Sequence, residues 1–464
     1  MPFPSLQLHS SHLRFLGAGA ALSLILLAFL VFGRGSSSYL GFEHGLGAGS
    51  GYTLKSPAGS GDSGRQCGEA GMEAETNSTG QWEFDVRRDG DNHGLLESQC
   101  LSAFPKLFGE IDRAADARGG GEGEGRAALI TFREVDAVGK GGEDGLVRGI
   151  VKGGDLYVVN FGDMPYTYSR GKATLYSLNR ALAAFPDRRN LPDIEFVLST
   201  DDFSTGKSPT WSYSKRPEDE GVWLMPDFGY WSWPEVKVGS YKEVRQRIAD
   251  VDGGDGSSKS NRGLRFKDKK KQLAWRGSVA TNIEIRGSLL NASRGKSWAS
   301  IREINWNDPE HVRANLLPME EYCRYMFLAH TEGRSFSGRG KYLLNCRSVM
   351  VSHKLQWLEA HHGALISSGP DANYVEVERD FSDLERKIEF LIDNPETAER
   401  IAENAVRTFR DRYLTPAAES CYWRHLIRRY AASCEFEPVL FETSRSGKKV
   451  ARAVHFESWV LNQG

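Results

Sequence analysis

Short apolar runs alternating with amphipathic patterns constrain the fold of this chain more than any other feature of its sequence. Residues 128–132, 156–161 and 194–198 are apolar runs of strand length, and residues 172–184 show helical spacing. Apolar runs of roughly four to eight residues are typical of buried strands. Strands that alternate with helices predict a parallel sheet covered by helices, which is an α/β fold.

A second set of strands is expected beyond residue 272. Residues 273–276, 349–352 and 374–377 are expected strands, and residues 341–346 an expected helix. Two such stretches separated by a glycine-rich insertion predict two sheets. A cleft between two sheets is a natural ligand site.

Three helices are expected after the second set of strands. Ser382 and Glu385 form a capping box before the first of them. Pro395 and Pro416 open the second and third, because proline is favoured in the first turn of a helix.

The length of 464 residues exceeds one ordinary domain of about 100 to 200 residues. Residues 36–79 are rich in Gly, Ser and Ala, a composition that buries too little apolar surface to fold. The expected parts are a short N-terminal tail at 1–14, a membrane anchor at 15–33, a disordered stem at 34–80, a first α/β domain at 81–262, a second α/β domain at 263–435 and a C-terminal tail at 436–464.

The anchor is expected because residues 15–33 are uncharged and long enough to cross a hydrocarbon core of about 30 Å. Arg14 and Arg34 close the run, which exceeds the apolar core of a signal peptide. The small residues that follow leave a cleaved signal peptide as the alternative. We expect a single-pass type II membrane protein of the Golgi or endoplasmic reticulum, with the bulk of the chain in the lumen.

Charge and cysteine content bear on partners and compartment. The net charge of −2 lacks the basic surface that a nucleic-acid-binding protein needs. Six cysteines, an even number, suit disulfides in an oxidising lumen, and the absence of CxxC argues against zinc. Sequons at Asn77 and Asn291 agree with that compartment.

Two short motifs are candidate phosphate-binding elements. Residues 334–341, RSFSGRGK, combine arginines, a lysine, serines and glycines, which supply backbone and side-chain donors for an anion. Residues 275–278, WRGS, follow an expected strand in a similar way. A solvated basic turn and an ordinary strand-to-helix turn are the respective alternatives.

The chain resembles glycosyltransferase family 90, the fungal capsule-associated proteins and animal protein O-glucosyltransferases. The resemblance runs from about Trp82 to about Cys434, and the order of its markers carries it. These markers are Gln99-Cys100, Leu191-Pro192-Asp193, Asp202, Trp231, Trp233-Pro234, Trp275-Arg276-Gly277-Ser278, Ser337-Gly338-Arg339, Cys346 with Ser348, and Cys421-Tyr422-Trp423.

The resemblance implies a GT-B fold, with two Rossmann-like domains facing a cleft. It implies inverting transfer of a sugar from a UDP donor with no bound metal and no resident cofactor. The first domain would then hold the acceptor and the second the UDP-sugar. The donor-site residues implied are Arg276, Gly277, Ser278, Ser337, Gly338 and Arg339.

Asp202 matches the family's catalytic base, the carboxylate that takes the proton of the acceptor hydroxyl. The sequence departs from the family here, because Ser204 stands where a proline is usual and a second carboxylate, Asp201, precedes the base. Consecutive residues of extended chain point to opposite sides, so only one of the pair should face the cleft. We favour Asp202, with Asp201 as the alternative.

Three other patterns favour ordinary roles over a functional one. Asp250-Val251-Asp252 matches a metal-binding DxD pattern but lies beside a glycine-rich insertion. His361-His362 has no ligand spacing around it and is expected at the surface. Trp231 and Trp233 suit either a sugar platform or the core.

The family pattern also implies disulfides between Cys323 and Cys346 and between Cys100 and Cys421, with Cys67 and Cys434 unassigned. We therefore expect a UDP-sugar glycosyltransferase acting on a glycan or glycoprotein hydroxyl, with xylose favoured over glucose. The alternative is a non-catalytic lumenal sugar-binding or quality-control protein with the same fold.

Overall fold

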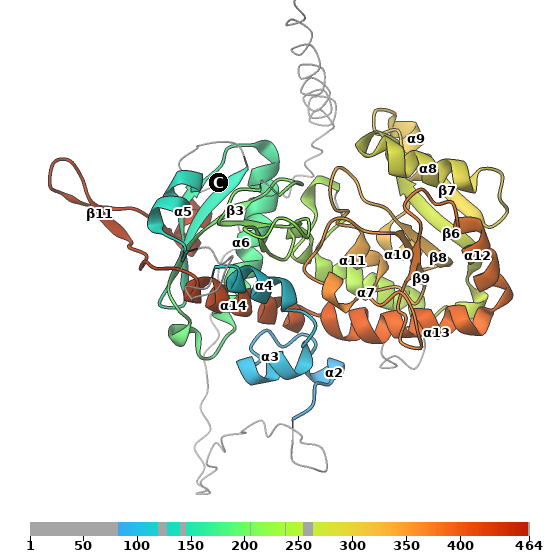
Figure 1. The fold of residues 1–464 in the computed structure, drawn as a ribbon, viewed down its shortest axis with the longest axis horizontal. Coiled ribbons are helices and arrows are strands. Elements are labelled where there is room, and N and C mark those ends of the chain that lie inside the picture. Colours follow the sequence, from blue (N-terminus) through green and yellow to red (C-terminus); the bar gives the residue numbers. More distant parts are fainter. Residues whose placement is uncertain are drawn as a thin grey trace, which may run out of the picture. The chain divides into compact units, whose positions relative to one another are not determined.

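The computed structural model describes residues 82–118, 128–139, 145–204, 206–236, 238–253 and 263–462. Within them lie a six-stranded sheet, a five-stranded sheet and a separate two-stranded ribbon (Figure 1). The predicted membrane anchor and stem lie outside the described residues. No helix of the described ranges is long and apolar enough to span a membrane.

The first sheet has the strand order β13-β2-β1-β3-β4-β5. Its strands β1 to β3 are antiparallel neighbours, and only β3, β4 and β5 are parallel to one another. The prediction of a parallel sheet is therefore wrong for half of this sheet. Its strands are β1 (Leu146–Lys152), β2 (Asp155–Phe161), β3 (Ile194–Ser199), β4 (Thr210–Ser212), β5 (Trp223–Leu224) and β13 (Val454–His455).

The second sheet is parallel throughout, as predicted, with the order β10-β9-β8-β6-β7. Its strands are β6 (Lys270–Gly277), β7 (Ala299–Glu303), β8 (Tyr325–His330), β9 (Val349–His353) and β10 (Val375–Val377). The two-stranded ribbon pairs β11 (Phe441–Thr443) with β12 (Lys449–Ala451). All carboxyl ends of the second sheet's strands lie at one edge, where ligands bind in open α/β sheets.

The helices surround these sheets in two groups. They are α2 (Val86–Asp89), α3 (Glu97–Ala103), α4 (Gly109–Asp116), α5 (Phe132–Gly139), α6 (Pro165–Ala183), α7 (Tyr241–Asp252), α8 (Ile283–Ser293), α9 (Pro309–Asn315), α10 (Met319–Tyr322), α11 (Gly340–Leu343), α12 (Leu384–Asp393), α13 (Pro395–Ala405), α14 (Pro416–Ala432) and α15 (Phe456–Leu461). Helix α6 contacts β1 and β2, and α13 contacts β9 (Figure 1). A π-helical segment, η7 (Val406–Tyr413), continues α13 toward α14.

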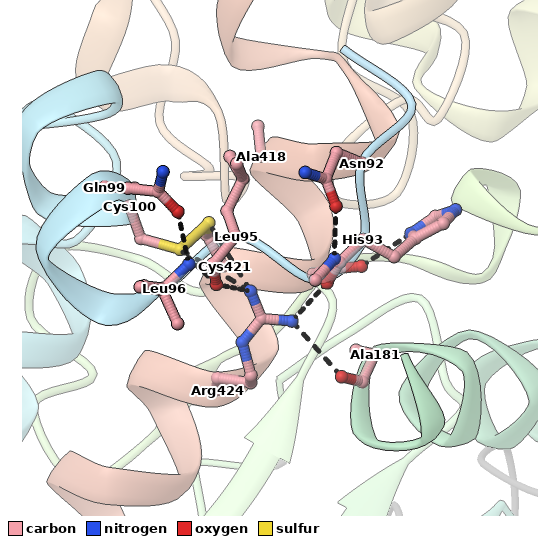
Figure 2. The surroundings of a disulfide bond; sticks show 12 residues. Asn92, His93, Leu95, Leu96, Gln99, Cys100, Ala181, Ala418, Cys421 and Arg424 are labelled. Atoms are coloured by element: carbon pink, nitrogen blue, oxygen red, sulfur yellow. Dashed lines mark hydrogen bonds between the residues drawn. A yellow bond between two sulfur atoms is a disulfide. The ribbon is translucent and has the colours of Figure 1, made fainter. Parts of the chain in front are cut away.

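Helix α14 packs on the first sheet although it follows the second in the sequence. It contacts α4, α6 and β3, and its Trp423 is fully buried. The predicted disulfide between Cys100 and Cys421 is confirmed and ties α3 to α14 (Figure 2). The Arg424 guanidinium donates hydrogen bonds to the backbone carbonyls of His93 and Leu95 at 2.6 and 2.8 Å. The last long helix is thus fixed to the first residues of the fold.

The other cysteines bear out part of the predicted scheme. The disulfide between Cys323 and Cys346 is confirmed. Cys434 is a free thiol whose pKa burial raises to about 12. Cys67 lies outside the described residues.

Two local predictions are wrong. The expected strand at 128–132 is reduced to one bridge at Ile130, because α5 already begins at Phe132. The expected capping box is absent, since α12 begins at Leu384 after Asp383. The helices predicted to open at Pro395 and Pro416 are confirmed, and Thr415 caps the latter.

Candidate active site

The loops at the carboxyl edge of the second sheet gather most of the predicted donor-site residues. Ser278 follows β6, and the 334–341 loop follows β8. The two segments meet where Arg339 donates a hydrogen bond to the Arg276 carbonyl. The structure therefore brings together two motifs that lie about sixty residues apart in the sequence.

Arg339 and Arg286 lie beside the same tryptophan at this edge. Their guanidinium carbons are 6.0 and 5.8 Å from the Trp275 ring centroid. Arg339 also donates to the Tyr322 hydroxyl at 2.9 Å, and Arg286 donates to the Ser278 carbonyl at 2.8 Å. Neutral oxygens thus hold two arginines near one aromatic ring.

Neither arginine forms an ion pair with a carboxylate of the described residues. Burial, with Arg339 nearby, lowers the pKa of Arg286 to about 9. Two neighbouring cations without a carboxylate partner attract an anion, because a guanidinium fork matches phosphate oxygens. Arg286 was missed by the sequence interpretation, since nothing in NIEIRGS distinguishes it from a surface arginine of a helix.

The predicted glycine and serine positions lie around these arginines. Ser278 is half-buried, and its hydroxyl forms no hydrogen bond with another of the described residues. A Cβ at Gly277 would lie 2.7 Å from the Trp275 ring, so glycine is needed there for that ring to pack against the strand end. Gly338 packs against Trp233, and Ser337 accepts a hydrogen bond from Gly340.

Arg276 differs from the other predicted donor-site residues in where its side chain lies. Its guanidinium donates to the backbone carbonyls of Trp275 and Asn315 at 2.8 and 3.0 Å, and to Ser300. Burial lowers its pKa. Only the backbone of Arg276 contacts Arg339, and its side chain joins β6 to β7 and α9.

Asp202 lies just beyond the end of β3, facing α6. Its Oδ1 accepts a hydrogen bond from Arg170 at 2.9 Å, and its side chain is 45% exposed. Arg170 also donates to Glu235 at 3.0 Å. Burial alone would lower the pKa of Arg170, but the carboxylates of Asp202 and Glu235 raise it above its usual value. Arg170 therefore stays charged and holds the Asp202 carboxylate in place.

Asp201 and Asp202 do not point to opposite sides, contrary to the prediction. Asp201 accepts a hydrogen bond from the Tyr166 hydroxyl, one turn before Arg170 on α6. The argument fails because β3 ends at Ser199 and the chain bends at both aspartates. Ser204, which replaces the usual proline, donates to Asp219 at 2.8 Å.

The backbone of Asp202 contacts the 334–341 loop directly. The Ser335 hydroxyl donates a hydrogen bond to the Asp202 carbonyl, and Ser214 donates to the same oxygen at 3.2 Å. Ser335 is fully buried in this contact. The backbone of the residue predicted to act as the base thus adjoins the loop that carries Arg339.

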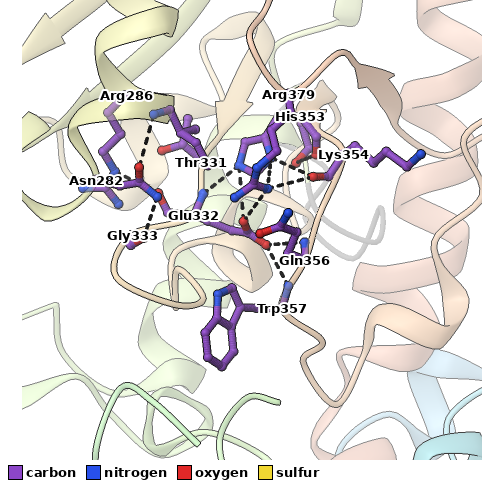
Figure 3. A network of polar contacts seen from close by, with 12 residues as sticks. Asn282, Arg286, Thr331, Glu332, Gly333, His353, Lys354, Gln356, Trp357 and Arg379 are labelled. Atoms are coloured by element: carbon purple, nitrogen blue, oxygen red, sulfur yellow. Dashed lines mark hydrogen bonds and ion pairs between the residues drawn. The ribbon is translucent and has the colours of Figure 1, made fainter. Parts of the chain in front are cut away.

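A buried polar network fixes the other loops at this edge (Figure 3). Glu332 accepts backbone hydrogen bonds from Gln356 and Trp357 at 2.6 and 2.8 Å and pairs with Arg379 at 2.9 Å. Its own backbone N–H donates to His353, whose pKa burial lowers. Because the loops after β8, β9 and β10 share one carboxylate, the edge is rigidly preformed.

One group of side chains has the composition of a metal site. Ligand atoms of Glu359, His361 and His362 lie within 4.8 Å of one another. His361 is buried, so its predicted surface position is wrong. His362 Nδ1 accepts from the Glu359 backbone N–H at 3.2 Å, which places the proton on Nε2, 3.3 Å from the Glu359 carboxylate. A metal ligand would need that nitrogen unprotonated, so the arrangement favours a close histidine–carboxylate contact over a metal site.

The Asp250-Val251-Asp252 pattern has a structural role in its second carboxylate. Asp252 forms a fully buried ion pair with Lys269 at 2.6 Å. Trp231 is partly buried against the core: its ring centroid is 5.1 Å from that of Tyr176, on which it stacks, and 4.8 Å from the Arg180 guanidinium carbon. Trp233 instead packs near Gly338 and stacks with Tyr342 at 6.5 Å.

The carboxyl edge of the second sheet thus carries two arginines that have no carboxylate partner among the described residues. The loop that carries one of them contacts the backbone of Asp202, which follows β3 of the first sheet. The family model described as glycosyltransferase family 90 matches residues 129–452. The chain belongs to this family.

Several curated proteins are similar to the chain at lower identity. An O-glucosyltransferase rumi homolog of Aedes aegypti is 25% identical over 278 residues, covering 54% of this chain and 64% of that protein. Protein O-glucosyltransferase 1 of Homo sapiens is 24% identical, covering 52% of this chain and 63% of that protein. Protein O-glucosyltransferase 3 of Rattus norvegicus is 22% identical, covering 59% of this chain and 54% of that protein. The matched segments span less than two thirds of these relatives.

Proposed function

We propose that this chain is an inverting glycosyltransferase that moves a sugar from a UDP donor to a hydroxyl of a glycan or glycoprotein. Family membership and the names of the relatives support sugar transfer. We further propose that the two sheets are the two halves of a GT-B fold, with the second holding the donor. The parallel order of the second sheet and the arginines at its carboxyl edge support that assignment.

The contact between Asp202 and the 334–341 loop carries the proposal. Through its backbone carbonyl and Ser335, Asp202 adjoins the loop that presents Arg339. A sugar joined to a diphosphate at Arg339 and Arg286 would extend toward Asp202. An acceptor hydroxyl bound between them would then have a base on one side and the sugar on the other.

In the proposed reaction Asp202 takes the proton of the acceptor hydroxyl as its oxygen bonds to the anomeric carbon. The bond from that carbon to the diphosphate oxygen breaks, and the electron pair leaves with UDP. Arg339 and Arg286 stabilise the charge that develops on the diphosphate, as fixed cations do in preorganised sites. Arg170 keeps the Asp202 carboxylate oriented until it is protonated. We propose that no metal takes part.

The names of the relatives change the choice of sugar. The sequence favoured xylose, whereas the similar curated proteins are named O-glucosyltransferases. We therefore propose glucose as the transferred sugar, with xylose second.

We propose that the protein works in the secretory pathway. The two disulfides among the described residues support an oxidising compartment, because such bonds rarely persist in the cytosol. The type II anchor at residues 15–33 and the Golgi or endoplasmic reticulum location remain predictions.

A donor and acceptor panel tests the function. Purified full-length protein in detergent would be given UDP-glucose or UDP-xylose with glycan and glycoprotein acceptors, and UDP release and product mass would be measured. Glucose transfer with inverted anomeric configuration is the expected result. UDP binding without transfer to any acceptor would instead support the non-catalytic sugar-binding alternative.

A further inference from the structure

A buried ion pair joins the 334–341 loop to the first-sheet side of the site. Lys341 Nζ donates to both carboxylate oxygens of Asp227, at 2.7 and 2.9 Å, and to the Gly338 carbonyl at 2.9 Å. The Lys341 side chain is fully buried and that of Asp227 is 3% exposed. All three ammonium protons are therefore satisfied.

The backbone around Gly229 leaves room for the Lys341–Asp227 ion pair and holds it in place. Asp227 Oδ1 also accepts from the Gly229 backbone N–H at 2.7 Å, and Tyr342 donates to the Gly229 carbonyl at 3.1 Å. A Cβ at Gly229 would lie 2.5 Å from Lys341 Nζ. Glycine at this position is thus what lets the lysine reach its carboxylate.

Stability alone is a weak reason for such a pair. Desolvation of two buried charges offsets their attraction, and apolar residues of similar volume often give equal or greater stability. The pair does fix positions, because Lys341 holds the carbonyl of Gly338, the residue before Arg339.

The other end of the pair leads to the predicted base. Asp227 is followed by Phe228, and the Arg170 guanidinium lies 4.9 Å from the Phe228 ring centroid. Arg170 in turn holds the Asp202 carboxylate. The ion pair therefore connects the arginine of the anion site with the arginine that orients the base.

We propose that Lys341 and Asp227 are positioning residues that keep Arg339 aligned with Asp202 across the two sheets. The inference rests on the proposed function, since it assigns the diphosphate to Arg339 and the acceptor proton to Asp202. A misplacement of about 1 Å between reacting groups can reduce turnover about 10²-fold.

Three double variants test the pair. Lys341→Met with Asp227→Leu removes both charges and their hydrogen bonds. Lys341→Gln with Asp227→Asn removes the charges but keeps donors and acceptors in place. Lys269→Met with Asp252→Leu is the matched control, an equally buried ion pair at the amino ends of the second sheet's strands.

The Met/Leu variant is expected to keep its melting temperature, lose about 10² in kcat and bind UDP about tenfold more weakly at unchanged stoichiometry. The Gln/Asn variant should recover part of both losses, and the control should lose neither. A purely structural pair would lower the stoichiometry of UDP binding and leave its affinity intact, which would overturn the proposal.

Hydrogen exchange separates this inference from the proposed function. In protein without ligand, amides of the 334–341 loop should exchange faster in the Met/Leu variant than in the wild type or the control. Unchanged exchange would overturn the positioning role even if UDP binds. Failure of the wild type to bind UDP, with faster exchange in the variant, would overturn the proposed function alone.

Discussion

The two sheets contribute to the candidate site with opposite electrostatic arrangements. On the side of the first sheet, Asp201 and Asp202 each accept a hydrogen bond from a residue of α6. On the side of the second sheet, Arg286 and Arg339 have no carboxylate partner within the described ranges. Buried or half-buried charges are usually paired or bind a ligand. The difference supports the proposed division, with proton transfer at the first sheet and anion binding at the second.

The substitution Asp202→Asn is the strongest test of this difference between the two sheets. Loss of a general base should lower turnover about 10² to 10⁴-fold, while UDP affinity stays unchanged because the diphosphate contacts only the second sheet. Steady-state kinetics and calorimetric UDP titration measure the two effects. Asp201→Asn is the matched control and should stay active. A dead Asp201→Asn beside an active Asp202→Asn would move the base one residue back.

The two sheets can also be compared by the stability that their disulfides contribute. Cys100–Cys421 fixes α14, which packs on the first sheet, and Cys323–Cys346 joins segments beside β8 and β9 of the second sheet. Cys100 and Cys421 are 321 residues apart, whereas Cys323 and Cys346 are 23 apart. In the chain-entropy model, replacing both members of a pair by serine should cost about 5 kcal/mol for the long loop and about 3 kcal/mol for the short one. Chemical denaturation measures both, and an equal loss would contradict the model.

The anion site is tested by separate substitutions of its arginines. Arg339→Ala and Arg286→Ala should each weaken UDP binding by about 1.5 to 3 kcal/mol, the value of a charge-assisted hydrogen bond. Arg276→Ala should leave the UDP affinity of folded protein unchanged, because that guanidinium donates to backbone carbonyls. Calorimetry measures all three. An equal loss in Arg276→Ala would restore the direct role that the sequence predicted for it.

The smallest expected effect is a pH dependence of UDP binding. The pKa of Arg286 is about 9 in the folded protein, below its ordinary value, so the guanidinium loses its proton as pH rises through that range. The charged form binds the anion, and UDP affinity should therefore fall above pH 9, by at most about tenfold per pH unit. Arg286→Gln should give a flatter profile between pH 8 and 10. Identical slopes would exclude Arg286 as the titrating group.

The sequence predicted β2 and β3 of the first sheet and β6, β9 and β10 of the second, whereas it missed β1, β4 and β5 of the first sheet. Strand β9 could be predicted because it is buried along its whole length and begins with an apolar run. Strand β1 was missed because Arg148 interrupts it, and the structure neutralises that charge with Glu195 at 2.7 Å from a distant strand. Strands β4 and β5 are too short to leave a periodic signal.

The residues of the candidate site also divide into those that a local sequence motif indicates and those that only tertiary packing brings together. Arg339 and Asp202 could be predicted because they stand in recognisable short motifs. Arg286 and Arg170 lie on helices, and their roles depend on what tertiary packing places beside them. Lys341 stood inside a predicted phosphate motif, yet its burial against Asp227 is a property of two distant segments that no local pattern records.

The disulfide between Cys100 and Cys421 can form only after nearly the whole chain has been synthesised. A ribosome adding roughly 5 to 20 residues per second needs roughly 15 to 65 s to make the 321 residues between them. Throughout that time Cys100 has no correct partner and Arg424 has not yet been translated, so α3 stays undocked. Cys323 and Cys346 are both translated before Cys421, so closing their own short loop would remove both as wrong partners for Cys100. A stop codon before Cys421 would leave the first residues of the fold without their last helix.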